Sequence, residues 1–548
     1  MATNASNEVT AVEGRRETYD SNMATSVSDV EKQPNEVSEQ ARPEGLVQEE
    51  EADVEKQTAA GATATGTGRN DDQGTNVVDW DGDDDPHNPY NWAGWLKFLN
   101  CFLVSALSFM TPLASSMFAP GVPDIMREFG ETNTQLGSLV VSIYVLGFAA
   151  GPLIFAPLSE LYGRLVVYHG TNIGFLAFMI ACSRAPSFNI LIAFRFLAGL
   201  FGSVPLTNGG GSIADMIVQE KRGVAMSAFA VGPLLGPIIG PVAGGYVTDA
   251  LGWRWVFYIL AMVSGAITGT FFLFARETYA PFLLARKTKK LRKQTGNAAL
   301  RSRLDPGLRP RDYFKRGLLR PLKMTVFSPI CVIAGVYVAL AYAYMYIMFT
   351  SLSPLFQLIY HFSVGEAGLS FLGLGVGSML GVLYFSRSSD RFIRKKAEED
   401  RLAAEAEGRE PGGMKPEYRL PPLKYGGLLL PVGLFIYGWT AEYEVHWIAP
   451  IIGTAVMGVA NLVIFMSLQM YLVDAFTIYA ASALASNAVL RSILGAVLPL
   501  AAPSMYDRLG LGWGNSLLGF IALVMVPAPW VVLRYGEYLR TRFAIKDL

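Results

Sequence analysis

Apolar stretches long enough to cross a bilayer recur along the chain from Trp95 onward, and short polar segments separate them. A membrane-spanning helix needs about 20 predominantly apolar residues. The pattern predicts an all-α membrane protein with twelve transmembrane helices in two six-helix bundles, at residues 95–118, 134–156, 165–183, 188–213, 224–247 and 253–275, and at 325–350, 365–386, 424–440, 447–472, 477–502 and 514–535.

The charged residues, only 17% of the chain against 51% hydrophobic, gather outside these spans. Residues 1–93 carry 21 acids against six Lys or Arg and have few apolar residues to bury, so we expect a disordered tail. Asp79–Trp92 resembles a calcium loop only in composition, and we expect a solvated acidic run there. The further predicted domains are the first bundle at 94–275, a basic linker at 276–323, the second bundle at 324–540 with a loop at 387–423, and a tail at 541–548.

Basic residues predict the orientation in the membrane. Arg276–Arg320 holds fourteen Lys or Arg against three acids, and further clusters follow the second, fourth, eighth and twelfth spans. Because Lys and Arg are enriched in cytoplasmic loops, both termini should be cytoplasmic. A basic linker facing anionic lipid explains this charge better than a nucleic-acid site does.

Glycine and proline recur every four residues in the fifth span, GPLLGPIIGPVAGG. A four-residue step keeps side chains on nearly one helix face, so this span has a seam that another helix can approach closely. Membrane helices tolerate such prolines. The seam is typical either of a packed structural helix or of a pivot between moving halves of a transporter. Its residues are Gly232, Pro233, Gly236, Pro237, Gly240, Pro241, Gly244 and Gly245.

Two arginines lie at membrane depth, Arg195 in the fourth span and Arg491 in the eleventh. Such charges cost about 2.5–3.5 kcal/mol each to insert, so each needs a reason. Both are candidates for a polar central cavity or for proton coupling; the alternative is a structural arginine bonded to backbone carbonyls. No Asp or Glu lies at mid-depth in any span. The cavity should therefore suit neutral or anionic amphipathic molecules, and no proton carrier is identified.

Polar side chains in four spans are candidates for lining a substrate cavity, although bonds between helices explain each of them equally well. They are Asn208, Tyr342, Tyr346, Asn461, Gln469 and Asn487. The turn after the second span, PLSELYGR, carries a candidate cytosolic gate at Glu160, Gly163 and Arg164, with Asp215 as the expected partner of Arg164. Glu160 could lie against a helix N-terminus, where the dipole favours an anion. A plain surface turn is the alternative. No metal cluster, phosphate-binding loop or cofactor motif is present in the sequence.

Together these motifs resemble the major facilitator superfamily and, within it, the fungal twelve-span drug:proton antiporters. PLSELYGR resembles motif A, RFLAGLFGS from Arg195 resembles motif B, and the Gly-Pro repeat resembles the antiporter motif C. RETYAPFLLARKTKKLR after the sixth span and AASALASNAVLRS in the eleventh are similar to stretches of the fungal group. The chain departs from the pattern at Ala156, Glu160, Leu165 and Arg276, where Gly, Asp, a basic residue and Pro are usual.

The resemblance implies a major facilitator fold and proton-driven export of hydrophobic or amphipathic small molecules, either xenobiotics or the cell's own secondary metabolites. It implies a monomer at the plasma membrane, with protons and a small-molecule substrate as partners, no cofactor, no nucleic acid and no enzymatic reaction. The alternative within the same fold is a facilitator or symporter of a nutrient or polyamine.

Overall fold

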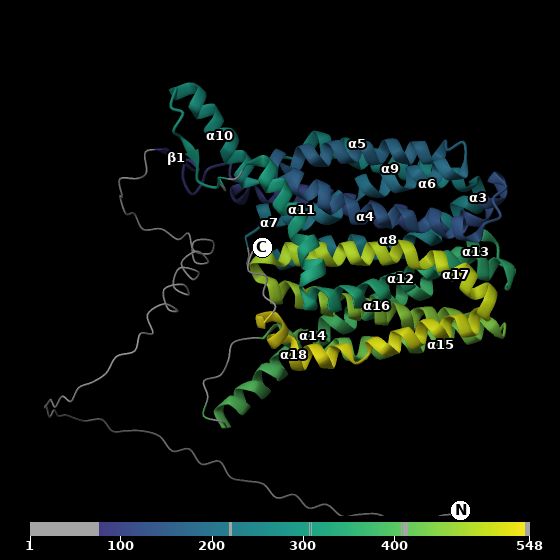
Figure 1. Ribbon diagram of the computed structural model, residues 1–548. Coiled ribbons are helices and arrows are strands. Elements are labelled where there is room, and N and C mark those ends of the chain that lie inside the picture. Colours follow the sequence, from purple (N-terminus) through teal and green to yellow (C-terminus); the bar gives the residue numbers. More distant parts are fainter. Residues whose placement is uncertain are drawn as a thin grey trace, which may run out of the picture. The chain divides into compact units, whose positions relative to one another are not determined.

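A computed structural model describes residues 76–542, apart from 219–221, 306, 308, 407 and 409–414. The N-terminal tail up to residue 75 and the end of the C-terminal tail from residue 543 lie outside the described residues. Long helices in two bundles make up most of the described chain, blue to teal for the first and green to yellow for the second (Figure 1).

The first bundle closely follows the six expected spans. The first span is broken after Ser116, where a 3-10 turn precedes a short helix, and the fourth span is broken at Ser203 ahead of Pro205. Its helices are α2 (Gly94–Ser116), η3 (Ala119–Gly121), α3 (Val122–Phe129), α4 (Thr134–Tyr162), α5 (Arg164–Ser183), α6 (Phe188–Gly202), α7 (Val204–Met216), α8 (Arg222–Leu251) and α9 (Trp253–Phe274).

The second bundle contains α12 (Pro329–Leu358), α13 (Val364–Leu369), α14 (Leu372–Ala406), η5 (Pro416–Arg419), α15 (Pro421–Glu442), α16 (Ile448–Phe476), η6 (Thr477–Tyr479), α17 (Ala480–Met525) and α18 (Ala528–Arg542). In α17, Gly510 has φ 72° and ψ 175°, which is not helical. The chain reverses there, because Ser516 contacts Trp439 near the end of α15 whereas Trp530 lies against Lys424 near its start.

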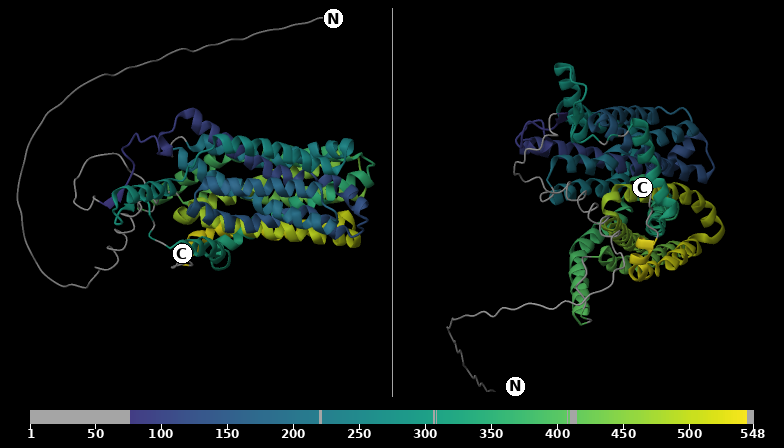
Figure 2. Two further views of the ribbon diagram at one scale, coloured as in Figure 1. Left: turned by 90° about the horizontal axis from the view of Figure 1, so that it is seen from above. Right: turned by 60° about the vertical axis from the view of Figure 1, so that its left-hand side comes forward.

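Twelve crossings follow from these helices. In the described part of the chain, ten stretches are long and apolar enough to cross a membrane. The last of them, Ala480–Arg542, supplies two crossings because of the reversal at Gly510, and α15 supplies one more. The axes of the helices in both bundles are roughly aligned with one another (Figure 2). We call the end that carries the linker helices α10 (Ala280–Thr295) and α11 (Pro310–Phe327) the linker face, and the end with α3 and α13 the far face (Figure 1).

The acidic segment before the first span is ordered from residue 76, whereas the sequence led us to expect a disordered tail as far as residue 93. Strand β1 (Val77–Val78) pairs in parallel with β2 (Arg301–Ser302) of the linker, and the 3-10 turn η2 (Pro89–Asn91) precedes α2. Lys287 of α10 donates to the Asp79 carbonyl at 2.8 Å. Lys287 also forms an ion pair with Asp81 at 2.6 Å, so an opposite-charge contact joins the basic linker to this acidic segment.

Candidate functional site

Arg195 is fully buried in the first bundle and all three of its guanidinium nitrogens are used. They donate to the carbonyls of Val140 at 3.3 Å, Ala114 at 2.8 Å and Ser115 at 3.1 Å. The last two carbonyls belong to the final turn of α2, where helix carbonyls lack partners and the dipole favours a cation. This geometry is that of a structural arginine, while a coupling role for Arg195 stays a prediction.

Two aromatic rings contact the Arg195 guanidinium. Its Cζ lies 4.1 Å from the centroid of Phe118 and 4.5 Å from that of Tyr144, distances at which a ring face attracts a cation. The Tyr144 hydroxyl donates to the Thr111 carbonyl of α2 at 3.0 Å. Helices α2, α4 and α6 are thus held together around one buried charge.

Arg491 of α17 has a different environment. Its Cζ lies 4.8 Å from the ring centroid of Tyr342 on α12 and 5.3 Å from that of Phe465 on α16. Its Nε is buried without a hydrogen-bond partner among the described residues. The two arginines that the sequence treats alike therefore differ: Arg195 donates to three backbone carbonyls, whereas Arg491 lies over two rings and its buried Nε has no acceptor in the described part of the chain.

The structure brings together some of the candidate cavity residues. The ring centroids of Tyr342 and Tyr346 lie 5.0 Å apart with the ring planes tilted by 47°, and the Tyr346 hydroxyl hydrogen-bonds the Ser115 hydroxyl of the first bundle at 2.7 Å. Asn487 donates to Gln469 at 3.2 Å.

The other two asparagines lie apart from this group. Asn461 donates to the Ala341 carbonyl at 2.7 Å and so forms a bond between helices, as the alternative reading allows. Asn208 lies in α7, where its amide nitrogen is buried without a partner among the described residues.

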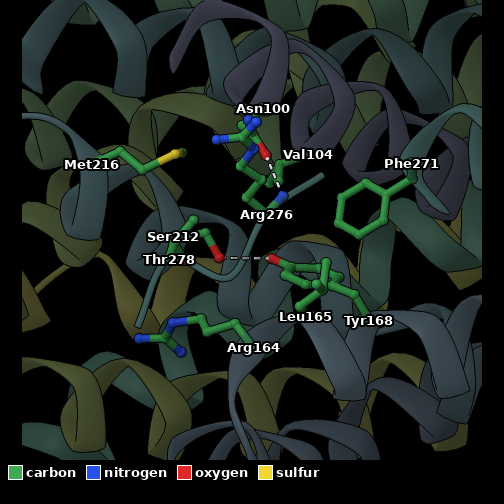
Figure 3. A pocket seen from close by; sticks show the side chains of 10 residues that line it. All are labelled: Asn100, Val104, Arg164, Leu165, Tyr168, Ser212, Met216, Phe271, Arg276 and Thr278. Atoms are coloured by element: carbon green, nitrogen blue, oxygen red, sulfur yellow. Dashed lines mark hydrogen bonds between the residues drawn. The ribbon is translucent and has the colours of Figure 1, made fainter. Parts of the chain in front are cut away.

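The predicted pair of Arg164 and Asp215 forms on the linker face, with Nε 2.8 Å from the carboxylate. Arg164 also donates to Ser159 at 3.2 Å and lies over the Tyr279 ring at 5.0 Å. Asp215 ends the fourth span, whereas Arg164 begins α5, so this pair ties two helices together. Figure 3 shows Arg164 beneath Tyr168, Ser212 and Thr278 in a small pocket of this layer.

Glu277 completes the same layer and is a functional candidate that the sequence reasoning missed. Its carboxylate accepts the backbone N–H of Arg164 at 3.1 Å and of Leu165 at 2.9 Å, in the first turn of α5. Gly163 has φ 91°, and a Cβ there would meet Glu277 Oε2 at 2.5 Å. We expected Glu160 to lie at a helix N-terminus, but at the N-terminus of α5 that place is taken by Glu277. Glu160 instead accepts a hydrogen bond from the Tyr313 hydroxyl of α11 at 2.8 Å. The sequence signal for Glu277 was its place in RETYAPFLLARKTKKLR, the stretch after the sixth span that is similar to the fungal group.

The second bundle repeats the pair on the same face. Arg419, at the end of η5, donates through Nε to Asp474 at 2.8 Å, the distance found for Arg164 and Asp215. The sequence analysis did not identify this second pair as a gate candidate, because the loop before α15 lacks a recognisable motif.

The glycine column of α8 packs against its own bundle. A Cβ at Gly232 or Gly236 would lie within 3.1 Å or 2.9 Å of α2 backbone atoms, and one at Gly240 or Gly244 would overlap Ser116 or Met117. Gly245 lies one residue further round the helix and faces α13, where its Cβ would be 2.8 Å from the Val364 carbonyl oxygen. The seam therefore joins α8 to α2, and only its last glycine touches the opposite bundle. Helix α8 stays continuous through its three prolines.

A cavity of about 570 Å³ lies at the far face and is lined by both bundles. Residues of α3 and α4 line one side and residues of α12 and α17 the other, among them Met126, Ser138, Pro354, Ala502 and Tyr506. The bundles also touch there directly: Gln135 donates to Ser504 at 2.9 Å, and Gln357 to the Pro120 carbonyl at 3.2 Å.

The model of the Major Facilitator Superfamily matches residues 104–499, well over half of the chain. This chain belongs to the major facilitator superfamily. The predicted fold is confirmed, and the membership identifies a membrane transporter rather than an enzyme. The superfamily's duplicated halves account for the two bundles and for the repeated Arg–Asp pairs.

Several fungal members of the superfamily are similar over most of their length. The MFS-type transporter tndD of Aspergillus flavipes is 53% identical over 499 residues, which cover 91% of each chain. The efflux pump radE of Floropilus chiversii is 49% identical over 491 residues, covering 89% of this chain and 90% of that one. The xylose transporter XylE from E. coli, in a partially occluded inward open conformation, has the same fold with a TM-score of 0.59 at 13% identity, covering 80% of this chain and 98% of that one.

Proposed function

We propose that this protein exports hydrophobic or amphipathic small molecules by alternating access, driven by protons that move inward. The observation that carries the proposal is the far-face cavity, because both bundles line it. Rocking of one bundle against the other would open and close a space of this kind, as in transporters built from repeats.

The direction of transport is proposed from the relatives. The pump radE, 49% identical over most of the chain, is named an efflux pump. The likeness to the xylose transporter is too distant in sequence to carry a substrate or a direction. The fungal relatives and the Gly-Pro column together favour export over uptake of a nutrient or polyamine.

The linker-face ion pairs are proposed as latches for one conformation. Arg164 with Asp215 and Arg419 with Asp474 are each partly withdrawn from solvent, which strengthens them relative to fully exposed pairs. Breaking such contacts in one state and remaking them in the other is a common device in switching proteins. Glu160 would support the first latch by holding α11 against α4.

The remaining assignments complete the proposal. The protein would act as a monomer in the plasma membrane, with both termini in the cytoplasm because the basic linker face would lie inside. Arg195 and Arg491 would influence the charge of the central region, and the export of toxic compounds would appear as drug resistance.

Efflux from yeast that lacks its own pumps tests this function. Expression should lower the accumulation of amphipathic toxic compounds, and a protonophore should abolish the effect. Asp215→Asn should impair efflux at normal surface expression, while Glu399→Gln, which removes an exposed charge on α14, should not. Efflux that persists with the protonophore would exclude proton coupling, and net inward accumulation would favour the nutrient or polyamine carrier.

A further inference from the structure

Arg491 is a half-buried cation of the second bundle, and within the described residues its buried Nε makes no hydrogen bond. Arg195 in the first bundle, by contrast, donates all its guanidinium nitrogens to carbonyls. In the described part of the chain, Arg491 has ring contacts only, and its buried Nε has no partner. A guanidinium without a partner in a membrane span is costly, so such a residue indicates a ligand that supplies the missing acceptor.

The position of Arg491 on α17 directs it away from lipid. Ile493 and Val497 are 39% and 55% exposed and mark the outer face of this helix. Arg491 and Gly495 lie on the opposite face, since two residues along a helix turn the direction by about 200°. A Cβ on Gly495 would be 2.9 Å from Tyr342 and 3.6 Å from Val145 of the first bundle. The partly exposed Arg491 side chain therefore faces the region between the bundles.

A second unpartnered group lies one turn away on the same face. Asn487 is 2% exposed, and its Oδ1 is buried without a partner in the described residues. The Asn487 amide nitrogen donates to Gln469, so Oδ1 is the side-chain atom that remains available to accept a hydrogen bond. One helix face thus offers a cationic donor and a neutral acceptor about 6 Å apart along the axis, beside the rings of Tyr342 and Phe465.

We propose that Arg491 and Asn487 form a binding site for the anionic group of the substrate, and that the exported class comprises carboxylates attached to an aromatic or other apolar body. The guanidinium binds the carboxylate, since planar Arg matches its two oxygens. Asn487 accepts from an O–H or N–H of the same molecule, and the two rings pack on its apolar body. No Asp or Glu at mid-depth in the spans competes for Arg491. The inference rests on the proposed export function, whose substrate class it narrows.

Binding of a matched pair of probes to the purified full-length chain tests the site directly. The probes are 1-naphthylacetate, which is an anion at neutral pH, and its neutral amide, which keeps the same ring. Wild type should bind the anion more tightly. Arg491→Gln should weaken binding of the anion by roughly tenfold to a hundredfold, as expected for loss of a charge-assisted bond, and leave the amide nearly unchanged.

Three further variants separate this role from a packing role. Arg491→Lys keeps the charge and should restore part of the preference for the anion. Asn487→Asp adds a negative charge beside the site and should weaken anion binding selectively. Arg508→Gln makes the same change at an exposed position of the same helix and should have no effect.

Equal binding of both probes by wild type would overturn the inference, and so would an Arg491→Gln variant that weakens both probes alike. Failure of the binding site can be told apart from failure of the proposed export function. A chain that shows no proton-driven efflux yet binds the anion through Arg491 would refute export but retain the site. A chain that exports compounds but shows no preference for the anion would refute the site alone.

Discussion

The Glu277 carboxylate bridges the backbone N–H groups of Arg164 and Leu165, at 3.1 and 2.9 Å, and so closes the N-terminal turn of α5 from a residue more than a hundred positions away. The same carboxylate accepts the N–H of Tyr279 at 2.9 Å, which fixes the chain where it leaves the sixth span. The Glu277 side chain therefore links the end of the sixth span to Arg164, the residue that forms the ion pair with Asp215.

Removing this carboxylate should loosen the linker face. Glu277→Ala leaves the first-turn N–H groups of α5 without an acceptor, and we expect a loss of about 1–2 kcal/mol in stability. Thermal unfolding of the purified chain, with efflux measured in parallel, checks this. Glu398→Gln on exposed α14 serves as control, because its pair with Arg401 is exposed. A Glu277→Ala variant as stable as wild type would show that the bridge contributes nothing.

Arg195→Lys separates the structural role of Arg195 from a coupling role. A lysine ammonium cannot reproduce the three bonds of the guanidinium fork, and a buried carbonyl at the end of α2 left without its donor costs about 1–3 kcal/mol. We expect a clear drop in melting temperature together with loss of efflux. Arg184→Lys, at an exposed position near Tyr258, should change neither. An Arg195→Lys variant with wild-type stability but no efflux would instead assign Arg195 to coupling.

The close contact between α8 and α2 predicts that the stability of the protein falls steeply when a larger side chain replaces a glycine of the α8 column. A Cβ at Gly244 overlaps the Met117 carbonyl oxygen, so Gly244→Ala must push the two helices apart. We expect it to cost about 1–3 kcal/mol, as for other overpacked sites. Gly269→Ala in α9 is the control, since nothing lies within 4 Å of its Cβ and alanine favours a helix. Unfolding temperatures of the two variants should therefore differ, and equal values would argue against close packing.

The acidic segment docked on the linker should respond to pH through Asp85. Burial alone raises the pKa of this carboxyl, but hydrogen bonds from the Asp81 and His87 backbones and the charge of Lys287 outweigh burial and lower the pKa to about 2. Because the folded-state pKa lies below the ordinary value, this stabilisation is complete above about pH 4 and disappears as the pH falls through about 2.

Hydrogen-exchange protection of residues 77–88 measures this effect. We expect protection to hold down to about pH 4 and to fall below it, following the depressed pKa of Asp85. Asp85→Asn should lower protection already at neutral pH, whereas Asp83→Asn should not, because the Asp83 side chain is exposed. Unchanged protection in the Asp85→Asn variant would mean that Asp85 does not hold the segment.

The number of crossings, their order in two sets of six and the pairing of Arg164 with Asp215 could be predicted from the sequence. Apolar length is a local property that the bilayer imposes on each span, and the two partners stand at the ends of neighbouring spans. Tertiary structure alone decided that Arg195 donates all its guanidinium nitrogens to carbonyls, whereas the Nε of Arg491 finds no acceptor among the described residues. It also decided that the glycine column packs against α2, and that Glu277 rather than Glu160 accepts the N–H groups at the start of α5. These outcomes depend on which backbone atoms, distant in the chain, come within hydrogen-bond or van der Waals distance after the helices pack, and no pattern along a single helix encodes that.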